Sequence, residues 1–224
     1  MRLLVLSDMH GDTANIEKLA GEFEKADAVV FAGDFTEFNK PETAEPAFKA
    51  LITRHDFIYA VIGNCDDPDF IEKLEDEDIS IQKNLVVSDH LCWLGSGGGL
   101  KFTGTTPNEL DEAGLMADLT PVTESDEAVW DNLILVTHQP PFDTGMDKIT
   151  AGISTGSKEI RAFIEKYQPL VAISGHIHES FAVNTLGKTT LMNPGSLAEG
   201  RYGIIELQRT GDRWEVTGAT LHQL

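Results

Sequence analysis

The chain has few cysteines and no long apolar run. Cys65 and Cys92 are its two cysteines, too few for the disulfide framework of a small secreted domain. The apolar run near the N-terminus, residues 3–6, is shorter than the core of a signal peptide. No run approaches the roughly 20 apolar residues that span a bilayer. We therefore expect a cytoplasmic protein without a membrane partner.

Basic residues are also scarce. The chain carries 17 Lys and Arg against 37 Asp and Glu, for a net charge of −20. A strongly negative surface repels phosphate backbones, so duplex nucleic acid is disfavoured as a partner. Residues 107–131 hold eight acidic and no basic residues. We expect this acidic segment to form a surface excursion, with a short helix, near the site entrance; the alternative is a solvated excursion that does not contact the site.

The 224 residues fit one α/β domain, residues 1–224. Short apolar runs without alternation predict strands buried on both faces. The runs are 3–6, 28–32, 57–62, 91–94, 133–136 and 170–173. Between them lie amphipathic stretches at 16–23, 46–53, 70–74 and 160–167, which gives a βαβ rhythm.

The last third of the chain changes character. Short strands are predicted over 181–185, 189–192, 202–207 and 214–220, with turns at Gly187 and Gly211. A β-rich tail after βαβ units predicts a second sheet packed on the first.

Asp, Asn and His residues directly follow five of the apolar runs. They are Asp8, His10, Asp34, Asn64, His138, His176 and His178. The carboxyl ends of strands are where α/β sheets build their sites. Carboxylate, imidazole and amide groups suit Mn²⁺, Fe, Zn²⁺ or Ni²⁺. Seven such groups are too many for one ion, but they suffice for two ions that share a carboxylate. Such a pair can hold a bridging hydroxide and grip both oxygens of an in-line phosphoryl displacement.

Each of these residues also has a simpler interpretation. An Asp after a strand usually caps a turn or helix, and a lone His is usually a hydrogen-bonded surface residue. We interpret His55, His90 and His222 in that second way. Four of the seven histidines fall at strand ends, however, and glycines at 11, 33, 63 and 175 would let backbone approach an ion closely. The combination favours metal binding.

The motif order Asp-x-His, Gly-Asp, Gly-Asn, His, Gly-His-x-His resembles the calcineurin-like metallophosphoesterases. The resemblance covers roughly residues 3–197, including the turn at 193–196, and is strongest to small single-domain bacterial and archaeal members and to class III phosphodiesterases. It implies an α/β/β/α sandwich, in which two mixed sheets are flanked by helices. It also implies two divalent transition-metal ions, with Mn²⁺ favoured over Fe, Zn²⁺ or Ni²⁺. Asp8, His10 and His178 would hold the first ion and Asn64, His138 and His176 the second, with Asp34 bridging them.

One position departs from the family pattern. Most members have His after the Gly-Asn pair, where it helps to protonate the leaving group, and this chain has Cys65 followed by Asp66. A thiol is a poor substitute for imidazole as a proton donor. Cys65 is therefore either a weak proton donor or a small buried residue without a catalytic role. The candidate catalytic residues are Asn64, Cys65, Asp66 and His138.

The function expected is hydrolysis of phosphodiesters or small phosphate esters by attack of a metal-bridging hydroxide. The alternatives are a phosphomonoesterase, including a phosphoprotein phosphatase, a nuclease of the same fold, and a non-catalytic scaffold that binds proteins. A nuclease usually needs a basic groove, and no Lys or Arg cluster is present. Every ligand position is filled, which favours an enzyme over a scaffold.

Overall fold

Two mixed sheets form the centre of the molecule. The structure, a computed structural model, describes residues 1–102, 104–124 and 130–224. The first sheet has the order β13 (Arg213–Gln223), β12 (Arg201–Thr210), β1 (Arg2–Leu6), β2 (Ala28–Phe31) and β3 (Ile58–Ala60). The second has the order β10 (Ala182–Leu186), β11 (Thr189–Asn193), β9 (Val171–Ser174), β8 (Leu133–Thr137), β5 (Leu91–Ser96) and β4 (Val86–Ser88). β1, β2 and β3 run parallel, as do β5, β8, β9 and β11.

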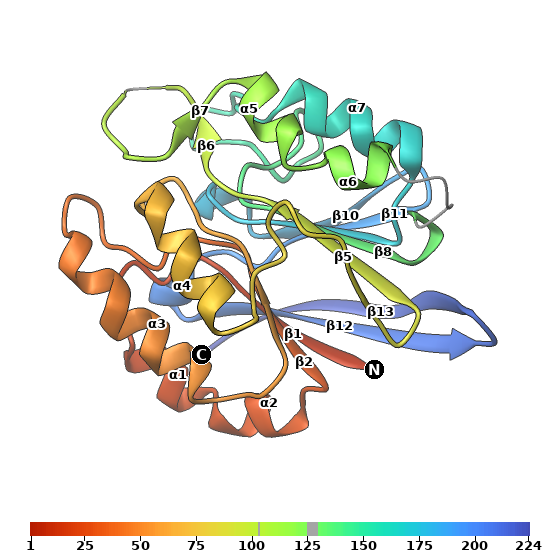
Figure 1. Cartoon of the computed structure of the whole chain (residues 1–224), viewed down its shortest axis with the longest axis horizontal. Coiled ribbons are helices and arrows are strands. Elements are labelled where there is room, and N and C mark those ends of the chain that lie inside the picture. Colours follow the sequence, from red (N-terminus) through yellow and green to blue (C-terminus); the bar gives the residue numbers. More distant parts are fainter. Residues whose placement is uncertain (103, 125–129) are drawn as a thin grey trace.

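Helices cover the outer face of each sheet (Figure 1). On the first sheet lie α1 (Ala14–Lys18), α2 (Ala20–Lys25), α3 (Ala44–Ile52) and α4 (Ile71–Asp76). On the second lie α5 (Glu112–Ala117), α6 (Thr120–Thr123) and α7 (Lys158–Tyr167). Short 3₁₀ turns are η1 (Pro41–Thr43), η2 (Pro68–Phe70), η3 (Trp130–Asn132), η4 (His178–Ser180) and η5 (Leu197–Glu199), and a small parallel pair joins β6 (Gly99–Leu100) to β7 (Glu109–Leu110).

The apolar strands fill both sides of their sheets, as strands buried on two faces must. In β1, Leu4 and Leu6 pack in a cluster with the α1–α4 helices, whereas Leu3 and Val5 pack in the cluster between the sheets. A third cluster lies between the second sheet and α5–α7. These three apolar layers confirm the predicted four-layer α/β/β/α sandwich.

A second sheet packs on the first, as predicted, but the prediction that the β-rich tail forms this sheet was wrong. β10 and β11 extend the second sheet, while β12 and β13 extend the first, where β12 pairs antiparallel with β1. The reason is that each parallel sheet has an open edge with unpaired backbone groups, and one hairpin from the tail pairs with each edge.

The stretch predicted as helical over 16–23 is divided at Leu19, which ends α1 and precedes α2. Ile16, Leu19 and Phe23 are buried against the first sheet, whereas Ala20, expected on the same face, is exposed. Among the described residues, none of the helices combines the length and apolar character needed to cross a membrane.

Candidate metal centre

The candidate ligands lie at the carboxyl ends of β1, β2, β3, β8 and β9, where the two sheets meet. His10 Nε2 lies 3.2 Å from His178 Nε2 and 3.8 Å from an oxygen of Asp8, and His178 Nε2 lies 3.3 Å from that same Asp8 oxygen. The ligand atoms of these three residues all lie within 4.8 Å of one another. They form a three-residue group of the kind that holds one ion.

A second group lies beside the first. His138 Nε2 is 2.9 Å from Asn64 Oδ1 and 3.5 Å from Asp34 Oδ2. That same Asp34 oxygen is 3.8 Å from His10 Nε2. Asp34 thus contacts both groups, the position that the sequence predicted for a shared carboxylate.

His176 is linked to the groups more loosely. Its ring centroid is 5.2 Å from that of His138, and its backbone N–H donates to the carboxylate of Asp8 at 3.1 Å. The His176 ring is absent from the groups of ligand atoms within 4.8 Å that the described residues form. The structure therefore brings all seven predicted residues together, six of them through close ligand atoms and His176 through its ring contact with His138.

Backbone carbonyl groups fix the orientation of two imidazoles. His10 Nδ1 donates to the oxygen of Thr36 at 3.0 Å, and His138 Nδ1 donates to the oxygen of Ala32 at 2.7 Å. A carbonyl oxygen only accepts, so each Nδ1 carries a proton, and Nε2 is the ring nitrogen that faces the site. Metal-binding histidines are held in the same way by a hydrogen bond to the other ring nitrogen.

The two site carboxylates are buried without a permanent cation. Asp8 is 0% and Asp34 2% exposed. Within the described chain, their ion pairs all involve histidines, with no Lys or Arg among them. Two buried, neighbouring anions are costly unless positive charge is close. This donor set fits divalent cations better than any group the described residues supply.

Burial and the neighbouring charges shift the pKa values of these groups. Burial raises the pKa of Asp34, but the charge of His138 outweighs this and leaves it well below its usual value. Burial lowers the pKa of His138, but the charge of Asp34 outweighs this effect and raises that pKa to about 9. The pKa of His176 falls to about 4, through burial and then through the charge of His138. At neutral pH the carboxylate and His176 are thus already in the forms that bind metal, whereas His138 must release its proton.

Four of the candidate ligands have a strained backbone. Asp8, His10, Asp34 and His176 have φ values of 54°, 47°, 62° and 67°, in the left-handed region that side chains other than Gly avoid. Gly63 is required by crowding, because a Cβ there would lie 2.0 Å from Asp34 Oδ1. Strain of this kind persists where the surroundings enforce it, and it is typical of functional sites.

Residues 1–180 match the family model described as calcineurin-like phosphoesterase. The chain belongs to the calcineurin-like phosphoesterases. It is 31% identical over 199 residues to an uncharacterized protein of Methanocaldococcus jannaschii, and the alignment covers 87% of this chain and 88% of the relative.

Two solved structures share the fold of this phosphoesterase. One is reported as a novel archaeal phosphodiesterase, with a TM-score of 0.57, 18% identity and coverage of 100% of both chains. The other is a dimetal phosphatase from Danio rerio, with a TM-score of 0.63, 9% identity and coverage of 100% of this chain and 98% of the other. Divalent metal ions are typical of the family, and the clustered carboxylates and imidazoles supply candidate ligands for them.

Asp66 of this phosphoesterase is fully buried and occupied by hydrogen bonds. Its carboxylate accepts the backbone N–H groups of Asp34, Phe35, Thr36 and Gly63, and also the Thr36 hydroxyl at 2.6 Å. Burial and the charge of Asp34 raise its pKa, while these donors favour the ionised form. Both oxygens are therefore engaged away from a substrate, which does not fit the catalytic role expected from the sequence.

Cys65 is partly exposed and faces the candidate ligands. Its backbone N–H donates to Asp34 at 2.8 Å, and its Sγ lies within 4.8 Å of ligand atoms of His10 and Asp34. Burial, followed by the charge of Asp34, raises the pKa of the thiol far above its usual value. Cys65 is thus only partly buried, whereas one interpretation of the sequence expected a small buried residue without a catalytic role.

Several supporting residues were not anticipated from the sequence. The Asn193 side chain donates to the backbone oxygen of Ile177 at 3.0 Å, and the Arg201 guanidinium donates to that of His178 at 2.9 Å. Asn108 donates its side-chain N–H to the oxygen of Gly63 at 3.0 Å. The Asn193 turn was noticed as a family motif, but no local pattern marks Arg201 or Asn108.

Among its described residues, the acidic segment 107–131 contacts the site at its beginning. Asn108 bonds the loop at Gly63, and Glu109 lines a pocket together with Asn64 and His176. Residues 112–123 form α5 and α6, which bury Leu115, Leu119 and Val122 against the second sheet. This part is core structure and not a surface excursion, because its apolar residues face the sheet. Residues 125–129 of the segment lie outside the described residues.

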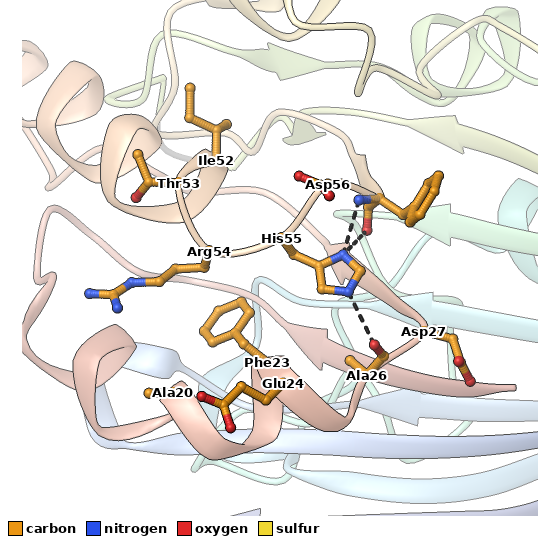
Figure 2. Close-up of a pocket in the computed structure, with 11 residues that line it drawn as sticks. Ala20, Phe23, Glu24, Ala26, Asp27, Ile52, Thr53, Arg54, His55 and Asp56 are labelled. Atoms are coloured by element: carbon orange, nitrogen blue, oxygen red, sulfur yellow. Dashed lines mark hydrogen bonds between the residues drawn. The ribbon is translucent and has the colours of Figure 1, made fainter.

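A separate pocket of about 610 Å³ lies between α2 and the loop after α3 and shares no residue with the candidate ligands. Figure 2 shows His55 there, with Nε2 donating to the oxygen of Ala26 at 3.1 Å and Nδ1 accepting from the N–H of Phe57 at 3.0 Å. His222 bonds Thr220, and His90 lies 3.7 Å from Asp212. These three histidines have local partners, as the sequence predicted.

Proposed function

We propose that the protein is a dinuclear metal-dependent phosphoesterase that hydrolyses phosphodiesters or other small phosphate esters. The observation that carries the proposal is the pair of buried carboxylates, Asp8 and Asp34, enclosed by imidazoles without a Lys or Arg partner among the described residues. Such a site is complete only when cations occupy it. The likeness to a dimetal phosphatase and to a phosphodiesterase is consistent with this activity.

Each ion has a proposed set of ligands. Asp8, His10 and His178 would hold one ion, and Asn64, His138 and His176 the other, with Asp34 shared between them. Carboxylate, amide and imidazole donors suit Mn²⁺, Fe, Zn²⁺ or Ni²⁺, and the family resemblance favours Mn²⁺ among them. When bound, two such ions supply Lewis acidity toward a phosphoryl group and lower the pKa of water.

The chain's own residues prepare this chemistry. The carbonyl groups of Thr36 and Ala32 hold His10 and His138 with Nε2 directed inward. We assign Asp66 as a positioning residue, because it fixes the backbone of 34–36 and Gly63. A site held rigid in this way needs little reorganisation during reaction.

Cys65 favours diesters with good leaving groups. A thiol stands where an imidazole would help to protonate the departing oxygen, so that contribution, typically about 10²–10⁴-fold, is weak. The aryl oxide leaving group of an aryl diester departs without much help from a proton donor, whereas the alkoxide leaving group of an alkyl monoester needs such help. We therefore expect aryl diesters to be better substrates than alkyl monoesters.

A panel of esters tests the proposal. Aryl and alkyl mono- and diesters are assayed with the full-length chain loaded with Mn²⁺, Ni²⁺, Zn²⁺ or Mg²⁺. We expect the highest kcat/KM for aryl diesters with a transition metal. A preference for alkyl monoesters would replace the diesterase proposal with a phosphomonoesterase, and cleavage of oligonucleotides alone would favour the nuclease. Inactivity on every ester with both ions bound would favour the protein-binding scaffold.

We further propose that residues 1–224 form one domain located in the cytoplasm. In support, one apolar cluster contains residues of both sheets, from Leu3 and Val30 to Ile134 and Ile173. Cys65 is a free thiol, as a reducing compartment favours.

A further inference from the structure

An apolar pocket of about 430 Å³ adjoins the candidate metal centre. Asn64 and His176, two of the candidate ligands, form its border with the centre. The surface that the pocket exposes is mainly apolar and is lined in part by Leu100, Phe102, Ile149 and Ile177, although the lining also includes the polar residues Lys101, Thr106, Glu109, Gln139 and Thr155. Its volume is in the range of small-molecule sites, roughly 300–1,000 Å³. A group attached to a phosphorus atom at the centre would therefore enter this pocket directly.

One wall of the pocket is ordered by a single carboxylate. Glu109 accepts backbone N–H groups from Phe102 at 3.0 Å, Gly104 at 2.9 Å, Thr105 at 3.1 Å and Thr106 at 3.3 Å. These bonds hold Phe102 and residues 104–106, which lie between the labelled strands β6 and β7 (Figure 1). Since Glu109 binds the backbone N–H of Phe102, this residue is presented on a structured support.

The wall is also tied to the centre. Asn108 donates its backbone N–H to the oxygen of Asn64 at 3.1 Å and its side-chain N–H to the oxygen of Gly63 at 3.0 Å. The distance from the candidate ligands to the pocket is thus set by hydrogen bonds.

Gln139 connects this wall to the opposite one. Its Oε1 accepts the N–H of Leu100 at 2.8 Å, and its Nε2 donates to the oxygen of Thr155 at 3.0 Å. Gln139 directly follows His138, and Ile177 directly follows His176. Gln139 and Ile177 thus each join the pocket to a candidate ligand. The hydrogen bonds of Gln139 hold the walls in place, so the cavity beside the reacting centre is preformed.

Phe102 identifies the chemistry of the occupant. Its side chain is 88% exposed although it borders an apolar cavity. An exposed aromatic ring beside a pocket gains free energy when an apolar group covers it. A polyol placed against these apolar side chains would lose hydrogen bonds to water.

We propose that this pocket binds an aromatic or similarly apolar substituent of the phosphate ester whose phosphoryl group lies at the candidate metal centre. The inference rests on the proposed function and adds to it the class of substrate. The protein is then specific for esters that carry at least one aromatic group, seated against Phe102, Leu100, Ile149 and Ile177.

Phosphonates test the pocket separately from catalysis, because their carbon–phosphorus bond is not a phosphoester. Binding of phenylphosphonate and of methylphosphonate to the metal-loaded, full-length protein is measured by titration calorimetry. We expect phenylphosphonate to bind on the order of tenfold more tightly, as burial of one ring predicts. Phe102→Ala should reduce that ratio to about threefold or less, and Phe102→Leu should restore part of it. Val87→Ala is the matched control, because Val87 is also an exposed apolar residue, at 65%, but lies on β4 outside the pocket.

The outcomes separate the two proposals. Equal affinity for the two phosphonates, or a ratio that Phe102→Ala leaves unchanged, would overturn the apolar pocket while the phosphoesterase stands. If a chain with two bound ions binds neither phosphonate and hydrolyses no ester, both proposals fail. Phe102 is exposed, so its replacement does not threaten the fold.

Discussion

At the scale of single residues, the site consists of side chains held in costly arrangements. Four candidate ligands have left-handed backbone, and two of them, Asp8 and Asp34, are buried carboxylates. Each such feature destabilises the fold by about 1–3 kcal/mol when nothing compensates it. Divalent cations would compensate the charges of the two buried carboxylates. The strained backbone would then serve to direct the ligand side chains toward these cations.

Cys65 provides a prediction at this scale. Cys65→His should raise kcat/KM for alkyl esters by roughly 10–100-fold, because an imidazole is a better proton donor than a thiol. Cys65→Ala should change aryl diester turnover by less than about threefold, since a good leaving group needs little protonation. Matched aryl and alkyl esters are assayed on the three proteins, with metal content determined for each. Loss of aryl diester turnover in Cys65→Ala with both ions bound would mean that Cys65 has another part in the reaction.

At the scale of elements, the loop after β2 depends on one side chain. Asp66 receives four backbone N–H groups and one hydroxyl from the loops after β2 and β3. Those loops carry Asp34 and Asn64. The geometry of the shared carboxylate therefore depends on Asp66, which lies behind it.

Asp66→Asn should lower the free energy of unfolding by about 2–4 kcal/mol, because an amide leaves buried donors unsatisfied. It should also reduce metal binding. Denaturant unfolding and metal analysis measure the two effects. Asp69→Asn serves as the control, because Asp69 is an exposed carboxylate in the same segment. Full activity with reduced stability alone would show that Asp66 supports the fold without positioning the ligands.

The elements differ in how far the sequence predicts them. The search for Asp, Asn and His residues after apolar runs located the seven candidate ligands. It succeeded because the buried strands are mainly apolar and are followed closely by polar residues such as Asp8, Asp34 and His138. The division of strands between two sheets could not be read locally, since pairing such as that of β12 with β1 depends on distant partners. The role of Glu109 in holding the backbone of Phe102 and residues 104–106 could not be predicted either, because an acidic residue in an acidic segment has no distinguishing local pattern.

At the scale of the whole molecule, the net negative charge of the chain opposes the binding of an anionic substrate at the site. The net charge is −20, yet a substrate carries negative charge to the centre. Two divalent cations would reverse the local sign and attract the phosphoryl group against the surrounding field. The bound ions are therefore central to both the stability of the site and its proposed function.

The number of ions bound per chain tests this account most directly. Elemental analysis of the full-length protein after loading with Mn²⁺ and removal of free metal should give about two ions per chain, as expected for a dinuclear site. Asp34→Asn should bind one or none, because Asp34 contacts both groups of ligands, while Asp12→Asn, at an exposed carboxylate in the loop after β1, should still bind two. One ion or fewer in the unaltered protein, with Asp34→Asn no different from it, would contradict the dinuclear centre.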